Sequence, residues 1–378
     1  MSEKDNLNKI TNEIVNATVN IKVIGIGGGG NNVIKRLCET LNLDMELIAV
    51  NTDAKQLNSL ADERIKKIQI GANLTRGLGC GGNIDKGREA AVNDYDALKN
   101  AVKGADMVFI TAGLGGGTGT GATPVIAQAA HEMGILTVGV VTVPFKFEGA
   151  RKKKSADAAL AAMAPYMDVL IAVHNDNLLK IKTSTKLTFV NAFKMADSVL
   201  HQGIRCITEL ILTVGVINVD FADVKSIFQQ STSPDALLGI GESANGAVEA
   251  VNEAISSPLV ERDLTGARGI ILNLSGDKNM TLFEIDEASR YVHSHTHPDV
   301  NIILGTVVNE KLNGRVRATI IATDFADSEL PSAGSSKDFA TVLKSGLKSV
   351  KQADKTAVKT SKEEDPDPLK LPDFMNKF

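Results

Sequence analysis

The chain has 378 residues, of which 43% are hydrophobic, 23% are charged and only 4% are aromatic. Its length suits two domains, and its net charge of −4 argues against a broadly basic surface for nucleic acid. Few and widely spaced cysteines, a polar N-terminus and the lack of a long apolar stretch argue against a disulfide framework, a signal peptide and a membrane span. We therefore expect a soluble protein of the reducing cytoplasm.

Apolar runs alternate with amphipathic segments from Ile21 onward. This alternation predicts a parallel sheet with helices on both faces, as in an α/β fold of the Rossmann-like kind. The expected strands are 21–26, 47–50, 107–111, 136–143 and 169–173. The expected helices are 32–41, 87–102, 120–133 and 153–163.

Residues 187–212 have apolar positions at helical spacing and no proline, which predicts one long helix joining two domains. The pattern after it is mixed α+β. Helices are expected near 222–230 and 247–255, and strands at 269–274, 301–308 and 316–323. Because Asn313-Gly314 separates the last two strands, we predict that they form a hairpin.

A glycine-rich segment, Gly-Leu-Gly-Gly-Gly-Thr-Gly-Thr-Gly at 113–121, lies between a predicted strand and a predicted helix. Backbone N–H groups of such a segment can converge on phosphate oxygens, and the helix dipole adds positive potential. The segment lacks the lysine of a Walker A sequence, so a bound Mg²⁺ would have to neutralise the phosphates. The expected phosphate ligands are Gly115, Gly116, Gly117, Thr118, Gly119, Thr120 and Gly121.

A second glycine-rich segment, 25–32, also lies between a strand and a helix and satisfies GxGxxG. Asp53 follows at the end of the next strand, where a dinucleotide fold places its ribose-binding acid. Taken alone, this pattern favours an NAD-dependent oxidoreductase. Two phosphate loops on different strands instead suit one mononucleotide whose triphosphate is held from two sides.

Several segments together resemble the nucleotide-contacting loops of the FtsZ family, the bacterial cell-division GTPases of the tubulin superfamily. These are Gly28–Asn32, Asn51-Thr-Asp53, 113–121, Val143-Pro-Phe-Lys-Phe-Glu-Gly149 and Asn175-Asp-Asn-Leu-Leu179. Segments 192–197, 218–225, 254–259 and 318–323 match the family as well, so the resemblance covers about residues 20–325 in the family's order. It implies a GTPase that binds GTP and GDP, with Mg²⁺ held mainly through the phosphates.

The resemblance also assigns roles to single residues. Glu148 corresponds to the acid that contacts the ribose, Phe193 to the residue that packs on the base, and Asp197 to the one that reads guanine. A carboxylate can accept both the N1–H and N2–H₂ donors of guanine, a pair that adenine lacks. Read as structure alone, Glu148 would be a surface side chain and Phe193 a core residue. The remaining implied nucleotide contacts are Gly28, Gly29, Gly30, Asn31, Asn32, Asp53, Lys152 and Asn175.

Asn218, Asp220 and Asp223 precede or begin a predicted helix. One explanation is structural, with Asp220 capping the helix and Asp223 favourably placed in its first turn. The resemblance implies another, in which this loop enters the nucleotide pocket of the next subunit and its acids polarise the attacking water. Hydrolysis would then be completed between subunits of a head-to-tail polymer.

Two features depart from the family pattern. Lys152 stands where the family usually has arginine, and a point charge cannot make the planar bidentate contact. The segment 229–236 also differs from the usual small, glycine-containing stretch. His293, His295 and His297 form an HxHxH run, which we interpret as a solvated connection rather than a metal site.

The expected organisation has six parts: a flexible arm (1–18), a nucleotide-binding domain (19–186), a central helix (187–213), an α+β domain with the catalytic loop (214–325), a disordered linker (326–370) and a partner-binding peptide (371–378). The final peptide, with Leu371-Pro-Asp-Phe-Met375, resembles the family's adaptor-binding tail. The resemblance thus implies a protein of the midcell division ring, tethered to the membrane through adaptors. A tubulin-like filament protein with plasmid or shape functions is the alternative.

Overall fold

The computed structural model describes residues 19–40, 44–180, 188–213, 219–257, 259–260 and 262–325, which all belong to one structural unit. The expected N-terminal arm, linker and C-terminal peptide lie outside these residues, as does Asn218. In the described part of the chain, no helix is both long enough and apolar enough to cross a membrane.

Within these described residues, ten strands form one sheet in the order β3-β2-β1-β4-β5-β6-β7-β10-β8-β9. The first six strands pair in parallel, and β6 pairs in parallel with the start of β7. Beyond that point β10 runs antiparallel to both β7 and β8, while β9 is parallel to β8. The strands are β1 (Ile21–Ile26), β2 (Glu46–Asn51), β3 (Ile65–Gln69), β4 (Met107–Gly113), β5 (Leu136–Val143), β6 (Val169–His174), β7 (Asp235–Ser243), β8 (Ala267–Gly276), β9 (Asn301–Val308) and β10 (Val316–Phe325).

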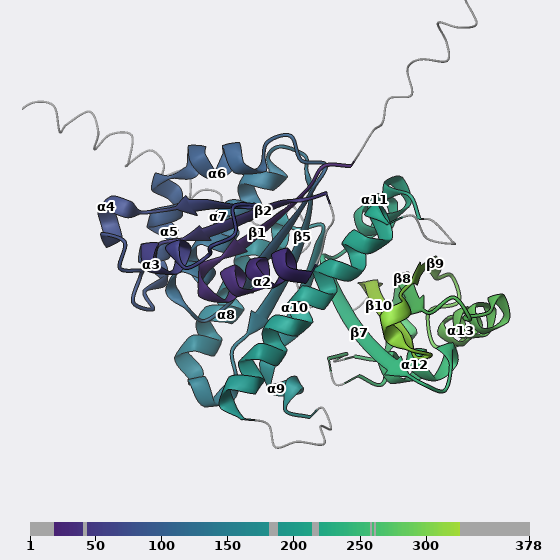
Figure 1. Cartoon of the computed structure of the whole chain (residues 1–378). Coiled ribbons are helices and arrows are strands. Elements are labelled where there is room, and N and C mark those ends of the chain that lie inside the picture. Colours follow the sequence, from purple (N-terminus) through teal and green to yellow (C-terminus); the bar gives the residue numbers. More distant parts are fainter. Residues whose placement is uncertain are drawn as a thin grey trace, which may run out of the picture. The chain divides into compact units, whose positions relative to one another are not determined.

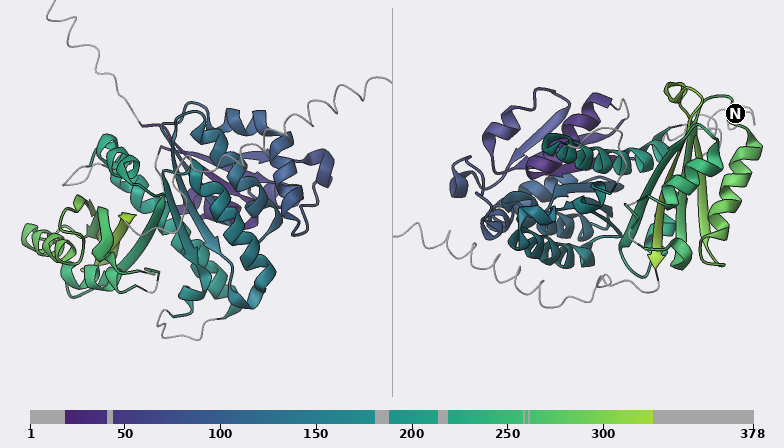
Figure 2. Two further views of the ribbon diagram at one scale, coloured as in Figure 1. Left: turned by 180° about the vertical axis from the view of Figure 1, so that it is seen from behind. Right: turned by 90° about the horizontal axis from the view of Figure 1, so that it is seen from below.

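Helices cover both faces of the parallel part of the sheet (Figures 1 and 2). On one face, α2 packs on β1, β2 and β4 and also contacts α10. On the other face α7 packs on β4 and β5, with α5, α6 and α8 around it. The helices are α2 (Gly27–Thr40), α3 (Ala54–Asn58), α4 (Ala72–Thr75), α5 (Ile84–Asn93), α6 (Tyr95–Val102), α7 (Gly117–His131), α8 (Ala150–Met163), α9 (Asn175–Leu178), α10 (Phe189–Leu212), α11 (Phe221–Gln230), α12 (Ala247–Ile255) and α13 (Leu282–Ser294).

The second part of the sheet buries its two faces in different cores, following the two-residue period of its strands. Leu238 of β7 and Ile321 of β10 join the core that also holds residues of β1, β5 and α10. Their neighbours Leu237 and Ile320 face the other way, into a core with α12 and α13. The long helix α10 therefore lies between both parts of the sheet and shares one hydrophobic core with them.

The α/β fold with a mostly parallel sheet is confirmed, and the predicted strands and the long helix lie where the sequence pattern places them. The predicted hairpin between the last two strands is wrong. Asn313 and Gly314 do adopt positive φ angles of 50° and 80°, as a tight turn requires. However, β10 inserts between β7 and β8, and β9 pairs with β8 instead.

Several helix boundaries also differ from the prediction, since α2 begins at Gly27 rather than Asn32 and α8 at Ala150 rather than Lys153. The helix expected over 87–102 is two helices that meet at Asp94, and α7 begins at Gly117 rather than Thr120.

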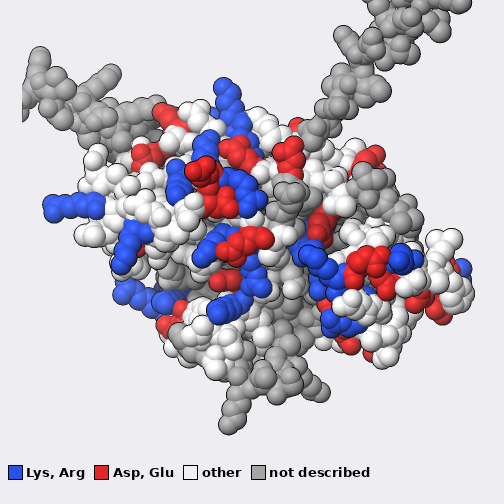
Figure 3. Space-filling model, in the orientation of Figure 1, with Lys and Arg blue, Asp and Glu red and all other residues white. Residues whose placement is uncertain are grey.

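Basic and acidic side chains alternate over the face that Figure 3 displays.

Candidate functional site

Both glycine-rich segments form the first turns of helices rather than loops ahead of them. Residues 27–30 open α2 after β1, and residues 117–121 open α7 after β4. Since the first four N–H groups of a helix have no partner within it, each segment directs unpaired donors outward at the carboxyl edge of the sheet. Both segments line one cavity of about 290 Å³, which suits a single mononucleotide phosphate chain better than two separate sites.

The two segments approach each other so closely that glycine is required between them. A Cβ atom on Gly27 would lie 3.0 Å from the backbone nitrogen of Gly119, and one on Gly119 would lie 2.7 Å from the carbonyl oxygen of Gly113. A Cβ on Gly116, in contrast, would meet nothing within 4 Å. Gly116 therefore faces open space at the cavity, whereas Gly27 and Gly119 hold the two phosphate loops together.

Two expected phosphate ligands are buried by packing instead. A Cβ on Gly30 would lie 2.4 Å from the carbonyl oxygen of Thr111, and one on Gly121 would lie 2.3 Å from that of Ile84. The hydroxyls are also committed to the protein: Thr120 Oγ1 accepts from Gly115 N at 2.8 Å, and Thr118 Oγ1 lies 2.7 Å from Thr52 Oγ1. Of the expected set, Gly28, Gly29, Asp53, Gly116, Gly117, Thr118 and Gly119 line the cavity.

A polar network fastens the first phosphate loop to the end of β2. Asn51 donates from Nδ2 to Asn31 Oδ1 at 3.2 Å and to Gln56 Oε1 at 2.9 Å. Asp53 caps α3 by accepting from Gln56 N at 3.1 Å. The Nδ2 of Asn31 is buried and has no hydrogen-bond partner within the protein. An unpaired buried donor beside a phosphate cavity is what an anionic ligand would satisfy.

The residues expected around the base gather at the start of α10. Asp197 accepts a hydrogen bond from Asn32 Nδ2 at 3.3 Å, and burial raises the pKa of the Asp197 carboxyl. Phe193, one turn earlier, packs edge-on against Phe145 with 5.4 Å between ring centroids. Asn175 begins α9, which contacts α10, and its buried Oδ1 has no partner within the protein. This acceptor and the Asp197 carboxylate are both suited to N–H or O–H donors of a ligand.

Glu148 and Lys152 lie close together at the start of α8. Lys152 Nζ pairs with Glu148 Oε2 at 2.9 Å, and Glu148 Oε1 accepts from Phe145 N at 3.0 Å. The lysine at the position where the family usually has arginine is thus held by the acid expected to contact the ribose. Lys152 also lines a neighbouring cavity of about 390 Å³ together with Gly115.

Asp220 and Asp223 lie near the opposite edge of the sheet from the phosphate cavity. Asp220 caps α11 by accepting a hydrogen bond from Asp223 N at 2.9 Å, so the predicted capping role of Asp220 is confirmed. Burial raises the pKa of Asp168, which directly precedes β6, and Lys225 of α11 is near enough to oppose part of that rise. In a parallel sheet the amino ends of the strands share one edge and the carboxyl ends the other. The two acids therefore do not reach the phosphate cavity of their own chain.

The sequence analysis missed one wall of the site. Leu78, Gly79, Cys80, Gly81 and Gly82 line the phosphate cavity opposite the two helices. The glycines of this stretch have φ angles between +58° and +80°, which only glycine adopts without strain. The repeated glycines of this stretch could have indicated part of the site. However, no predicted strand directly precedes them, as one does for the other two glycine-rich segments.

The three histidines of the HxHxH run do not converge. His293 is in the last turn of α13, His295 follows the helix and bonds to the Tyr291 carbonyl, and His297 accepts from Asp299 N. Among the described residues, no group of three or more His, Cys, Asp or Glu side chains is arranged to hold a metal ion.

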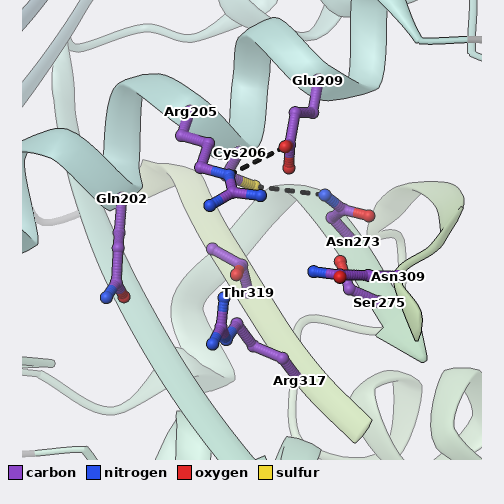
Figure 4. Close-up of a pocket in the computed structure, with 9 residues that line it drawn as sticks. All are labelled: Gln202, Arg205, Cys206, Glu209, Asn273, Ser275, Asn309, Arg317 and Thr319. Carbon is purple, nitrogen blue, oxygen red and sulfur yellow. Dashed lines mark hydrogen bonds and ion pairs between the residues drawn. The ribbon is translucent and has the colours of Figure 1, made fainter. Parts of the chain in front are cut away.

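A small cavity of about 20 Å³ lies between α10 and the second part of the sheet (Figure 4). The Cys206 thiol accepts from Asn273 Nδ2 at 3.8 Å there, and burial raises the pKa of Cys206 to about 12. Arg205 pairs with Glu209 on the same helix at 2.8 Å. This cavity has room for about one water molecule, so we interpret it as part of the junction between α10 and the sheet.

Comparison with known proteins agrees with this geometry. The model of the Tubulin/FtsZ family GTPase domain matches residues 20–183, and that of the FtsZ family C-terminal domain matches residues 235–326. The structure of an empty FtsZ dimer from M. jannaschii is 40% identical, with a TM-score of 0.77 over 85% of this chain and 92% of that chain.

More distant structures share the fold. CetZ2 from Haloferax volcanii, in a GTPγS-bound protofilament, is 20% identical with a TM-score of 0.68, covering 90% of this chain and 100% of that chain. The GDP-bound CetZ1 monomer from the same organism is 18% identical with a TM-score of 0.69, covering 88% and 100%. The two family matches and the 40% identity over most of both chains show that this chain belongs to the FtsZ family of tubulin-like, GTP-binding cytoskeletal GTPases.

Proposed function

We propose that copies of this chain assemble head to tail and complete GTP hydrolysis at the contact between them. The catalytic residues would be Asp220 and Asp223 of one copy, which would meet the phosphate cavity of the next, and Asn218 of the same sequence segment is proposed to act with them. The FtsZ structure from M. jannaschii is described as a dimer, which supports self-association. The filaments would form the cytokinetic ring at midcell.

The observation that carries this proposal is the separation of the two halves of the site. The phosphate cavity lies where β1 and β4 end, and α11 lies near the residue that precedes β6. A second copy stacked in the same orientation would bring its own α11 to the cavity. The phosphate cavity and the two acids of one chain lie at opposite edges of the sheet, so they would act together only where two copies meet.

Within the pocket, we assign the phosphates to the first turns of α2 and α7, the ribose to Glu148 and the base to Phe193 and Asp197. Asp53 is the carboxylate among the described residues that line the phosphate cavity. Since Mg²⁺ is commonly held by one or two carboxylates plus substrate phosphates, the residues present fit an ion held mainly through the nucleotide. The ion would neutralise charge that no lysine of the phosphate loops neutralises.

Exposed apolar side chains at the same edge support a contact with a second copy. Leu78 beside the phosphate cavity is 82% exposed, Phe147 after β5 is 60% exposed and Leu179 after α9 is 51% exposed. Large exposed apolar side chains are typical of surfaces that become buried on association.

A mixing experiment tests the proposal. Asp223→Ala chains keep an intact cavity, and Gly116→Asp chains keep intact acids while placing a negative charge at the phosphates. Each variant alone should have little GTPase activity, and an equimolar mixture should recover part of it, because one type of contact in the mixture is complete. Activity of the mixture equal to the mean of the two variants would refute hydrolysis between copies. Sedimentation with GTP against GDP tests assembly itself, with pelleting expected only with GTP.

Localisation at the ring and recruitment of membrane-tethering adaptors are proposed from the sequence of the tail. Residues 371–378 contain four large apolar side chains after a long charged segment. Such a peptide is suited to dock into a groove of a partner protein. A role in plasmid partition or cell shape is the competing function, and imaging of a fluorescent fusion in dividing cells separates the two.

A further inference from the structure

We propose that the cavity lined by Arg151, beside the phosphate cavity, is a binding site for the orthophosphate released by hydrolysis. This inference rests on the nucleotide site proposed above. The cavity has a volume of about 390 Å³, and it shares Gly81 and Gly82 with the phosphate cavity. The two spaces are therefore neighbours across one stretch of glycine backbone.

The two cavities are also adjacent at the phosphate loop that opens α7. Gly115 lines the Arg151 cavity, and the next residue, Gly116, lines the phosphate cavity. A Cβ on Gly115 would lie 3.2 Å from the Cβ of Lys152, so the start of α8 packs directly on the phosphate loop. A phosphate ion leaving the γ position reaches the Arg151 cavity without crossing the core.

The side chains that line the Arg151 cavity are hydrogen-bond donors. Arg151 and Lys152 are cations, and Ser155 carries a hydroxyl. Asn83 accepts the capping hydrogen bond of α5 with its Oδ1, so its Nδ2 is available to donate to a ligand. No carboxylate is among the described residues that line the cavity. This composition fits a small dianion and repels none of its charge.

Arg151, rather than Lys152, is the cation best placed to hold the ion. Lys152 is paired with Glu148 at 2.9 Å, whereas the exposed guanidinium of Arg151 has no ion pair within the described part of the chain. A guanidinium can also donate two parallel hydrogen bonds to one phosphate. Lys153 and Lys154 continue the basic run but do not line the cavity.

The same chemistry has a second source, the γ-phosphate of bound GTP. If Arg151 bound that group before cleavage, its loss would weaken GTP and leave GDP binding unchanged. If it binds the released ion, both nucleotide affinities stay the same and only orthophosphate binding changes. We commit to the released ion, because Arg151 lines the neighbouring cavity and not the phosphate cavity itself.

The test measures orthophosphate binding to the GDP-loaded chain by ³¹P NMR titration, for the wild type, Arg151→Gln and the control Lys153→Gln. We expect Arg151→Gln to bind orthophosphate about tenfold more weakly and the control to match the wild type. Because the variant holds the released ion less tightly, Arg151→Gln should also shorten the lag between GTP cleavage in quenched samples and the appearance of free phosphate detected by a sensor protein.

Three results would overturn the inference: equal orthophosphate binding by all three chains, an equal loss in Lys153→Gln, or a selective loss of GTP affinity in Arg151→Gln. The last result would assign Arg151 to the γ-phosphate. Failure of the wild type to bind GDP would instead refute the nucleotide site on which the inference rests, and a GDP titration run first shows this separately.

Discussion

Asn32 of α2 donates a hydrogen bond to Asp197 of α10 at 3.3 Å, joining the helix that opens on the phosphates to the helix proposed to read the base. The bond therefore links the two ends of the proposed nucleotide pocket. Burial raises the pKa of Asp197, and Asn32 and Arg36 oppose that rise. Because an ionised carboxylate is needed to accept both guanine donors, the proposed base recognition would depend on how these surroundings set the charge of Asp197.

Asp197→Ala should weaken GTP binding about tenfold to a hundredfold, since two hydrogen bonds to a charged acceptor are lost. ATP binding should stay unchanged because adenine lacks the donor pair. Competition with a fluorescent guanine nucleotide measures both. Asp197→Asn provides a sharper result, since its amide can donate to the C2 carbonyl of xanthine and should shift preference toward xanthosine triphosphate. Ser198→Ala, the next residue of α10, is the control, and equal binding of GTP and ATP by the wild type would contradict the assignment.

The two acids proposed to be catalytic, Asp220 and Asp223, should differ in their effect on stability. Asp223 contributes its backbone N–H to the cap of α11, while Asp220 contributes its side chain. Asp223→Ala should therefore lose most GTPase activity at unchanged stability. Asp220→Ala should lose activity and also about 1 kcal/mol of unfolding free energy.

Asp220→Asn separates the two roles, because asparagine caps a helix as well as aspartate but carries no charge. We expect wild-type stability with little hydrolysis. Full activity of this variant in a steady-state assay would show that Asp220 acts only as a cap.

The strands that surround the phosphate cavity were predictable because they are continuous apolar runs. The strands missed by the sequence analysis lack that pattern for identifiable reasons. β3 lies at the sheet edge with exposed lysines at Lys66 and Lys67, and β7 contains Gly239 and Gly241. A Cβ on either glycine would lie within 2.5 Å of a carbonyl of α12, so these glycines allow close helix packing rather than marking a loop.

The glycine pattern alone predicted the two phosphate loops, whereas the roles proposed for the ribose and base residues came only from the family resemblance. Sequence spacing places Asp197 and Phe193 on one face of a helix, but it does not reveal that Asn32 reaches Asp197. The predicted hairpin between the last two strands was wrong for a similar reason. The Asn313-Gly314 turn determines local chain direction, and the choice of β8 as the partner of β10 depends on burial across the whole sheet.

Substitutions at Gly119 and Gly116, at the start of α7, should separate effects on folding from effects on nucleotide binding. Gly119→Ala places a methyl group 2.7 Å from a backbone carbonyl, so we expect a loss of about 1–3 kcal/mol of unfolding free energy together with nucleotide binding. Gly116→Ala enters open space with φ −86° and ψ 173°, which alanine adopts freely. It should keep its stability and weaken GTP binding by intruding on the phosphates. Urea denaturation and nucleotide titration measure the two effects, and equal destabilisation by both changes would contradict the packing argument.

Deletion of residues 371–378 should leave GTPase activity and filament formation intact and abolish recruitment by a membrane-tethering adaptor. The reason is that the peptide follows a long charged segment and carries no residue assigned to the nucleotide site. Co-pelleting with adaptor-coated vesicles measures recruitment. A scrambled peptide of the same composition is the control, since it keeps hydrophobicity but not order. Wild-type pelleting by the deleted chain would show that the adaptor binds elsewhere.

Acid should destabilise the chain through His201. This histidine is 5% exposed, its Nε2 lies 2.7 Å from Thr40 Oγ1, and burial, with Arg36 and Arg205 nearby, lowers its pKa to about 4. The unfolded chain takes up the proton near the ordinary value of 6.5 and the folded chain does not. Stability contributed by the neutral histidine is therefore complete above about pH 6.5 and is lost as the pH falls toward 4.

Between about pH 7 and pH 5 this linkage amounts to about 2 kcal/mol of unfolding free energy. His201→Gln keeps a polar group beside Thr40 but does not titrate, so its stability should fall less than that of the wild type over this interval. His293→Gln changes an exposed histidine of α13 and should behave like the wild type. Urea denaturation followed by circular dichroism at both pH values measures the difference. An equal loss in the wild type and His201→Gln would mean that other groups cause the acid sensitivity.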